Sequence, residues 1–202
     1  MIDPQNPHAV VDALGQAPLD ALGAAVAATR TDLGRYRRTL PDLAARHTQR
    51  GLLNWIHDQF FAHARNLFEA GVPEASVLDR EPVRDLFVGH TFRIRLKKHT
   101  DRDQVTSYPT DGFLAFAQQD QPQLIQEIRL IGGYHWDPET REIGAAVLSA
   151  RDGAHGLLWV RELVEVAVED RTVRFDLGMP EVALPELPKI IETVAIERSE
   201  RA

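Results

Sequence analysis

The 202-residue sequence contains no cysteine. This absence excludes disulfide bonds, thiolate nucleophiles and the zinc or iron–sulfur centres that need cysteine ligands. Any metal site would have to use histidine and carboxylate side chains. Because no such arrangement matches a known motif, we expect neither a metal nor another cofactor.

Long apolar runs are also missing. No stretch approaches the roughly 18 uninterrupted apolar residues of a membrane-spanning helix. The N-terminus, MIDPQNPHAV, lacks the basic and apolar regions of a secretory signal. We therefore expect a cytoplasmic protein with no membrane partner.

Positive charge is in the minority, with 23 lysines and arginines against 30 aspartates and glutamates, for a net charge of -7. Nucleic-acid-binding domains usually carry a net positive charge. The composition therefore favours a protein partner over nucleic acid, although a local basic surface is compatible with it.

The pattern along the chain predicts an α+β fold, with N-terminal helices packed on a mostly antiparallel β-sheet that carries one inserted short helix. Residues 1–71 are expected to be helical. Residues 72–178 are expected to form the sheet part of the same globular unit, and residues 179–202 a proline-containing C-terminal tail.

Helices are predicted throughout the N-terminal part. An alanine- and leucine-rich stretch favours a short helix, a break near Gly15 and a longer helix from about Leu19 to Arg38. Pro41 suits the first turn of another helix. Gly51 is expected to separate that helix from a regular one, whose apolar side chains recur at helical spacing: Leu53, Ile56, Phe60, Ala64 and Leu67.

Strands are predicted after residue 72. EPVRDLFVGHTFRIRLKKHT suggests an approach segment and one long strand, followed near residue 110 by a short helix with Phe113 and Phe116 facing inward. Beyond Pro122, short turns separate four or five further strands. Gly132 and Gly133 indicate a bulge or a close approach of two chains.

The stretch TFRIRLKKHT, residues 91–100, has an unusual outer face. Because side chains alternate along a strand, three apolar residues share one side and four basic residues share the other: Arg93, Arg95, Lys97 and His99. Two interpretations stay open. The basic face pairs with acids of this chain, such as Asp58, Asp85 or C-terminal carboxylates, or it is a bare docking stripe for an acidic partner.

Aromatic residues and arginine are enriched at protein interfaces. We therefore expect the partner-binding residues to combine the basic face with nearby side chains of the helix and sheet: Arg93, Arg95, Lys97, His99, Trp55, Asp58, Tyr134 and Trp136. A second basic cluster surrounds Tyr36 and consists of Arg35, Arg37 and Arg38.

Catalytic motifs are not found. His57 and His63 lie on opposite sides of their predicted helix, and the HExxH metallopeptidase motif is absent. There is no GxSxG elbow, and Ser149 is expected in a turn or capping position.

A restriction-type nuclease needs two carboxylates and a lysine around a divalent metal. Asp79, Glu81 and Asp85 precede the basic strand, but the element that should read (D/E)xK reads RLK. An arginine thus replaces a required carboxylate, which weakens the nuclease hypothesis.

Three segments, GLLNWIHDQFFAH, EPVRDLFVGHTFRIRLKKHT…TSYPT and GYHWDPETREIGAAVLSARDG, resemble a group of actinobacterial and prophage proteins over roughly Gly51 to Glu162. Members of that group are encoded beside helix-turn-helix proteins fused to, or accompanied by, an ImmA/IrrE-type zinc metallopeptidase. The resemblance implies a phage-defence toxin–antitoxin pair, in which the small companion neutralises the peptidase-like toxin. It implies no catalytic residue.

The leading hypothesis is therefore a non-catalytic antitoxin or regulator that binds a metallopeptidase-type toxin encoded nearby. A DNA-binding transcriptional regulator or co-repressor is the alternative, and a divalent-metal-dependent nuclease comes third. Self-association is compatible with all three.

Overall fold

A computed structural model of the chain describes residues 1–80, 83–105, 111–119, 126–153 and 156–165. It confirms the predicted α+β class. The helices are α1 (Pro7–Leu14), α2 (Gln16–Thr39), α3 (Pro41–Arg46), α4 (Gln49–Gly71) and α5 (Asp111–Ala117). The strands are β1 (Ala75–Arg80), β2 (Val83–Val88), β3 (Phe92–His99), β4 (Ile128–Asp137), β5 (Glu142–Asp152) and β6 (Gly156–Glu162). The expected tail, residues 179–202, lies outside the described residues, as do residues 166–178 of the expected sheet part.

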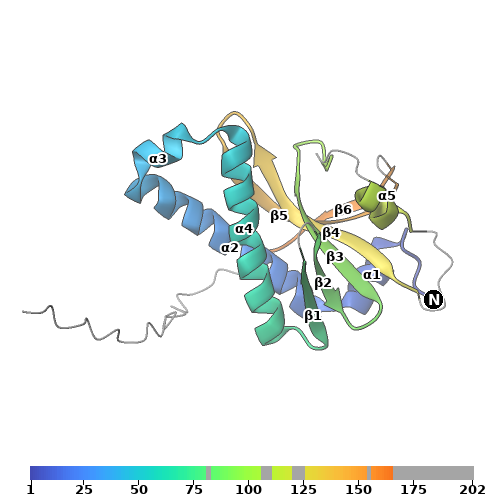
Figure 1. The fold of residues 1–202 in the computed structure, drawn as a ribbon. Coiled ribbons are helices and arrows are strands. Elements are labelled where there is room, and N and C mark those ends of the chain that lie inside the picture. Colours follow the sequence, from blue (N-terminus) through green and yellow to red (C-terminus); the bar gives the residue numbers. More distant parts are fainter. Residues whose placement is uncertain (81–82, 106–110, 120–125, 154–155, 166–202) are drawn as a thin grey trace, which may run out of the picture. The chain divides into compact units, whose positions relative to one another are not determined.

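The six strands form one sheet in sequence order, β1 to β6. Every neighbouring pair is antiparallel except β3 and β4, which run parallel and are connected through α5. Helices α2 and α4 pack together and against the sheet (Figure 1). Leu130 belongs to the core on the α2 and α4 side, whereas the next residue, Ile131, packs with α5. Helix α5 therefore covers the opposite face of the sheet.

Local chemistry explains where the helices begin and end. The Asn6 side chain caps α1 by accepting hydrogen bonds from the backbone N–H groups of His8 and Ala9. Gly15, with φ of 81°, ends α1 and allows α2 to begin at once. Thr48 caps α4 by accepting from the N–H of Gly51, so Gly51 lies inside α4 and does not precede it as predicted.

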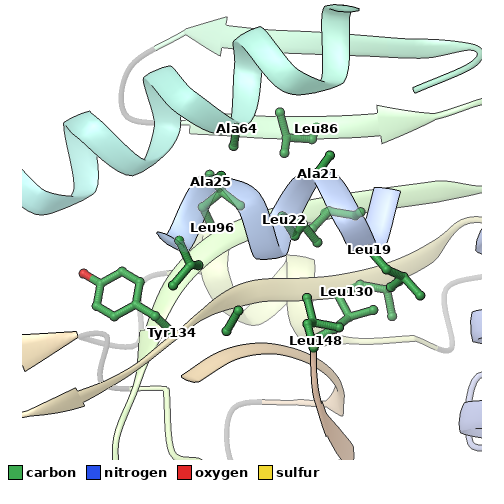
Figure 2. Close-up of a cluster of buried hydrophobic side chains, with 14 of the residues drawn as sticks. Leu19, Ala21, Leu22, Ala25, Ala64, Leu86, Leu96, Leu130, Tyr134 and Leu148 are labelled. Carbon is green, nitrogen blue, oxygen red and sulfur yellow. The ribbon is translucent and has the colours of Figure 1, made fainter. Parts of the chain in front are cut away.

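The main core lies between the two long helices and the sheet. Figure 2 shows leucine and alanine side chains of α2 and α4 packed against leucines of the strands and Tyr134. Each fully buried leucine stabilises the fold by about 1.5–3 kcal/mol. On α4 the buried face is Leu52, Ile56, Phe60, Phe61, Ala64 and Phe68. The predicted face was therefore right at its centre, but Leu53 and Leu67 lie at its margin and are only partly buried.

The predicted strand pattern needs two corrections. The approach segment is a strand of its own, β2, and the residues before it form the unpredicted strand β1. Of the four or five strands expected after Pro122, three lie among the described residues. Residues 163–165 are not in a strand, and the rest of that region lies outside the described part of the chain.

Among the described residues, no single helix is long and apolar enough to cross a membrane. Helices α1 and α2 satisfy the length and composition criteria only when taken together, and they are bent by 91° at their junction.

The parallel pairing of β3 and β4 depends on Gly133, which lies opposite Lys97. A Cβ atom on Gly133 would lie 1.7 Å from the Lys97 carbonyl oxygen, a separation that two atoms cannot adopt. We expect Gly133→Ala to lower the free energy of unfolding by about 3 kcal/mol, because one of the two strands must move. Urea unfolding measures the change. Gly71→Ala, where a Cβ meets no atom within 4 Å, is the matched control, and an equal loss in both variants would contradict the close approach.

Candidate functional site

The basic face of β3 pairs with an acid of the same sheet. Asp85 on β2 is fully buried (0% exposed) and lies opposite Arg95. Its Oδ2 accepts hydrogen bonds from Arg93 Nε and Nη2 at 2.8 and 2.5 Å and from Arg95 Nη2 at 2.9 Å. Its Oδ1 accepts from Arg95 Nε at 2.7 Å. We call these three residues the Asp85 cluster. Of the two open interpretations, internal pairing is therefore correct for Arg93 and Arg95.

Helix α5 covers the same arginines. The Phe116 ring centroid lies 4.0 Å from the guanidinium carbon of Arg95 and 5.5 Å from that of Arg93. Such cation–π contacts attract more strongly when water is excluded. Phe113 and Phe116 are buried, which confirms their predicted inward direction. The Arg95 side chain keeps only 12% of its surface exposed, so it is not the bare docking group that the second interpretation required.

Lys97 and His99, the other two residues of the basic face, are partly and fully buried. Lys97 lies 6.0 Å from the Phe113 ring centroid, and its pKa is lowered, chiefly by burial and further by Arg95. His99 was expected to contact a partner, and in this structure it is fully buried and offers no exposed surface. Burial is also the main cause that lowers the pKa of His99 to about 4, and the imidazole is therefore neutral at pH 7.

His99 contacts a serine whose predicted position is wrong. Ser149 lies inside β5 and not in a turn, and its Oγ is 2.9 Å from His99 Nε2. A serine beside a histidine is the start of a nucleophilic site. Here both residues are fully buried, and His99 Nδ1 makes no hydrogen bond to orient the ring. The pair therefore serves as a hydrogen bond across the interior of the sheet.

A second histidine lies next to this pair. His135 packs its ring edge-on to His99 with centroids 6.4 Å apart, and its Nε2 lies 2.7 Å from Asp103 Oδ1. The buried Arg151 donates a hydrogen bond to the carbonyl oxygen of Asp103. These contacts tie the turn after β3 to β4 and β5.

The other expected partner-binding residues divide between surface and core. Tyr134 and Trp136 are buried, and burial raises the pKa of the Tyr134 hydroxyl, so neither offers a docking surface here. Asp58 is exposed and accepts a hydrogen bond from Arg84 Nη1 at 2.6 Å. Trp55 is half-buried and stacks on Tyr36, with ring centroids 5.0 Å apart.

Three of the described residues that were considered for metal binding are paired with other groups. His63 Nε2 lies 2.7 Å from Asp32 Oδ2, and this contact takes the place of a shared site with His57. Both oxygens of Asp85 are occupied by guanidinium groups, and Asp79 accepts from arginines as well. In the described part of the chain, no three histidines or carboxylates are grouped to hold a metal ion.

The structure adds an exposed surface that the sequence pattern indicated only in part. Helix α3 lies at the end of the α2 and α4 pair, and none of its residues is buried (Figure 1). Leu40 and Leu43 are 45% and 50% exposed. Three exposed arginines lie close to them in sequence, as does the exposed Asp42 of α3. We call the following group the α3 surface: Arg38, Leu40, Leu43, Arg46 and Arg50.

The arginines of the α3 surface form no ion pair in the part of the chain that the structure describes. No carboxylate lies within 4 Å of the side chains of Arg38, Arg46 or Arg50 among the described residues. The cluster predicted around Tyr36 pointed to this region. The two leucines of TLPDLAARH were not recognised as part of this surface. They lie in or next to a helix but are not packed into the core.

Comparison with protein-family models, curated proteins and solved structures finds no match to this chain.

Removing the charge of Asp85 tests how much the Asp85 cluster stabilises the fold. We expect Asp85→Asn to lower the free energy of unfolding by about 3–5 kcal/mol, because Arg93 and Arg95 would keep their burial and lose the carboxylate that both of them contact. Urea unfolding at neutral pH measures the loss. Asp58→Asn, which breaks an exposed pair, should cost about 1 kcal/mol or less. Similar losses in the two variants would argue against a special contribution from Asp85.

His99 should make stability depend on pH. Its folded pKa of about 4 lies below the ordinary value of 6.5, so the unfolded chain takes up the proton first. The contribution of His99 to the free energy of unfolding is therefore fully present above about pH 6.5. It decreases as the pH falls toward 4, by roughly 3 kcal/mol over that range. His99→Gln removes the titrating group, so its stability should fall less over the same window. Urea unfolding across this pH range measures the difference, with His8→Gln at an exposed position as control; equal slopes in all proteins would refute the assignment.

Proposed function

We propose that this chain is a non-catalytic cytoplasmic binding protein, which acts as the antitoxin or regulator of a metallopeptidase-type toxin encoded nearby. The resemblance over roughly Gly51 to Glu162 supports the choice of partner. The side chains that could take part in catalysis are used in contacts within the fold, which supports a binding role. Asp85 is held by two arginines, and Ser149 and His99 are sealed from solvent.

The observation that carries the proposal is the α3 surface. An exposed short helix with two half-exposed leucines contributes little to its own core, because α3 buries no residue. Apolar side chains surrounded by arginine are typical of the centre and rim of protein interfaces. The binding site proposed here is therefore the α3 end of the helical layer, and not the sheet face that the basic strand suggested.

A DNA-binding regulator is the second candidate. The arginines Arg38, Arg46 and Arg50 favour it, since phosphate contacts need cations that are not already neutralised. The two exposed leucines and the net charge of -7 favour a protein partner. Binding to duplex DNA that falls steeply with salt, and that Arg46→Gln weakens, would support the regulator instead.

Co-expression with the product of the adjacent gene tests the antitoxin proposal. We expect that product to arrest growth alone, and this chain to restore growth and to co-purify with it as a stable complex. Leu43→Gln should weaken the complex by about tenfold or more, because an interface leucine is replaced by a polar side chain. Leu157→Gln, at a leucine on β6 that is 41% exposed, is the control. A neighbour that is harmless alone and forms no complex would refute the proposal.

A further inference from the structure

A surface cavity opens beside the exposed leucines. Its volume is about 300 Å³, and it is lined by residues of α2, α3, α4 and the turn between β4 and β5: Arg37, Pro41, Ala44, Ala45, Leu52, Thr140 and Arg141. Apolar carbon forms most of this lining, and Arg37 and Arg141 are its charged residues. A cavity of this composition suits a side chain that is apolar along its stem and negatively charged at its tip.

The two guanidinium groups are held in place by neutral acceptors. Arg37 Nη2 donates a hydrogen bond to the carbonyl oxygen of Arg141, and Arg141 Nη2 donates to the carbonyl oxygen of His47 at 3.0 Å. Backbone carbonyls orient these cations without neutralising their charge. In addition, Arg141 Nε is buried and has no hydrogen-bond partner. The arginines are thus preorganised for an anion.

Among the residues that the structure describes, no carboxylate pairs with the arginines of the cavity. Asp42, Glu139 and Glu142 are near it in sequence, yet none of the acids in the described ranges lies within 4 Å of Arg37 or Arg141 side-chain nitrogens. Thr140 is also committed, because its hydroxyl donates to Asp137 at 2.7 Å. As far as the described ranges go, the positive charge of Arg37 and Arg141 is therefore open to an incoming anion.

We propose that the α3 surface and this cavity bind an acidic amphipathic segment of the partner protein, with apolar side chains on Leu40 and Leu43 and one carboxylate between Arg37 and Arg141. This inference rests on the proposed function and names the kind of segment that the partner presents. Charge complementarity selects the carboxylate, and the half-exposed leucines select a peptide over a nucleic acid, whose phosphates offer no apolar counterpart.

The strained turn residue at the cavity fits this assignment. Arg141 has φ of 58°, a left-handed conformation that is unfavourable for a residue with a side chain. The conformation places the Arg141 carbonyl where Arg37 donates to it and the Arg141 guanidinium against His47. Strain of this kind is found where a structure holds a side chain ready for binding.

A double-mutant cycle with a designed peptide tests the carboxylate contact. The probe is a fluorescently labelled helical peptide of about 15 residues, since shorter isolated helices are marginal in water. It carries leucines along one face and glutamates beside them, and a second version has glutamine in place of glutamate. Fluorescence anisotropy with the full-length chain gives the dissociation constants.

We expect Arg37→Gln to weaken binding of the glutamate peptide by about tenfold and to leave binding of the glutamine peptide nearly unchanged. Leu43→Gln should weaken both peptides by about tenfold, since it removes an apolar contact and not a charge. Arg161→Gln and Leu157→Gln on β6, both at exposed positions, are the matched controls and should change neither constant.

Three results would overturn the inference. The first is no binding of the glutamate peptide, and the second is an equal effect of Arg37→Gln on both peptides. The third is duplex DNA that binds more tightly than the peptide and is unaffected by Leu43→Gln, which would assign the surface to nucleic acid. Circular dichroism verifies that each variant is folded.

The same variants separate this inference from the proposed function. If the chain neutralises the neighbouring toxin and neither Arg37→Gln nor Leu43→Gln weakens the complex, the antitoxin function stands and the segment assignment fails. If the glutamate peptide binds as expected and the toxin does not bind, the segment assignment stands and the antitoxin function fails.

Discussion

The buried carboxylate of Asp85 is the constraint on which this side of the sheet depends. A lone charge in the interior costs several kcal/mol, and here four hydrogen bonds from Arg93 and Arg95 offset that cost. The geometry is satisfied only when Asp85 lies opposite Arg95, so the cluster specifies the register of β2 against β3. A slip of one residue would turn the carboxylate toward the apolar core of α2 and α4. Helix α5 then completes the cluster by placing Phe116 over both guanidinium groups.

This use of the basic strand changes where a partner would bind. Arg93 and Arg95 of β3 are paired with Asp85 within the fold and largely covered, so they do not form a bare stripe on the surface. Other cations keep no acidic partner within 4 Å among the described residues, and one group of them lies around α3 and the turn between β4 and β5. There, Arg37 and Arg141 are oriented by carbonyl groups, and exposed leucines stand beside them. In the described part of this acidic chain, one group of arginines is thus paired inside the fold and a second group has no acidic partner.

Local patterns predicted much of the fold. Pro41 begins α3, the helix breaks at Gly15, and the phenylalanines of α5 face inward, because each depends on chemistry within a few residues. Strand β1 was missed because its burial does not alternate strongly at the edge of the sheet. The contact between His99 and Ser149 was missed for a different reason. The two residues are fifty positions apart in the sequence. They are brought together because β3 and β5 flank β4, and His99 reaches Ser149 across Gly133, which has no side chain.

The sequence by itself determined the α+β class, the helical layer, the alternation of β3 and the exclusion of cysteine chemistry, because these follow from composition and from short periodic patterns. It also predicted that the basic face of β3 needs a negative partner. Only the tertiary structure decided which acid that is, since Asp58 and Asp85 are equally plausible by sequence and differ in the strand register that brings one of them opposite Arg95. It likewise decided that the leucines of α3 stay outside the core, because burial depends on which elements pack together in space and not on the residue alone.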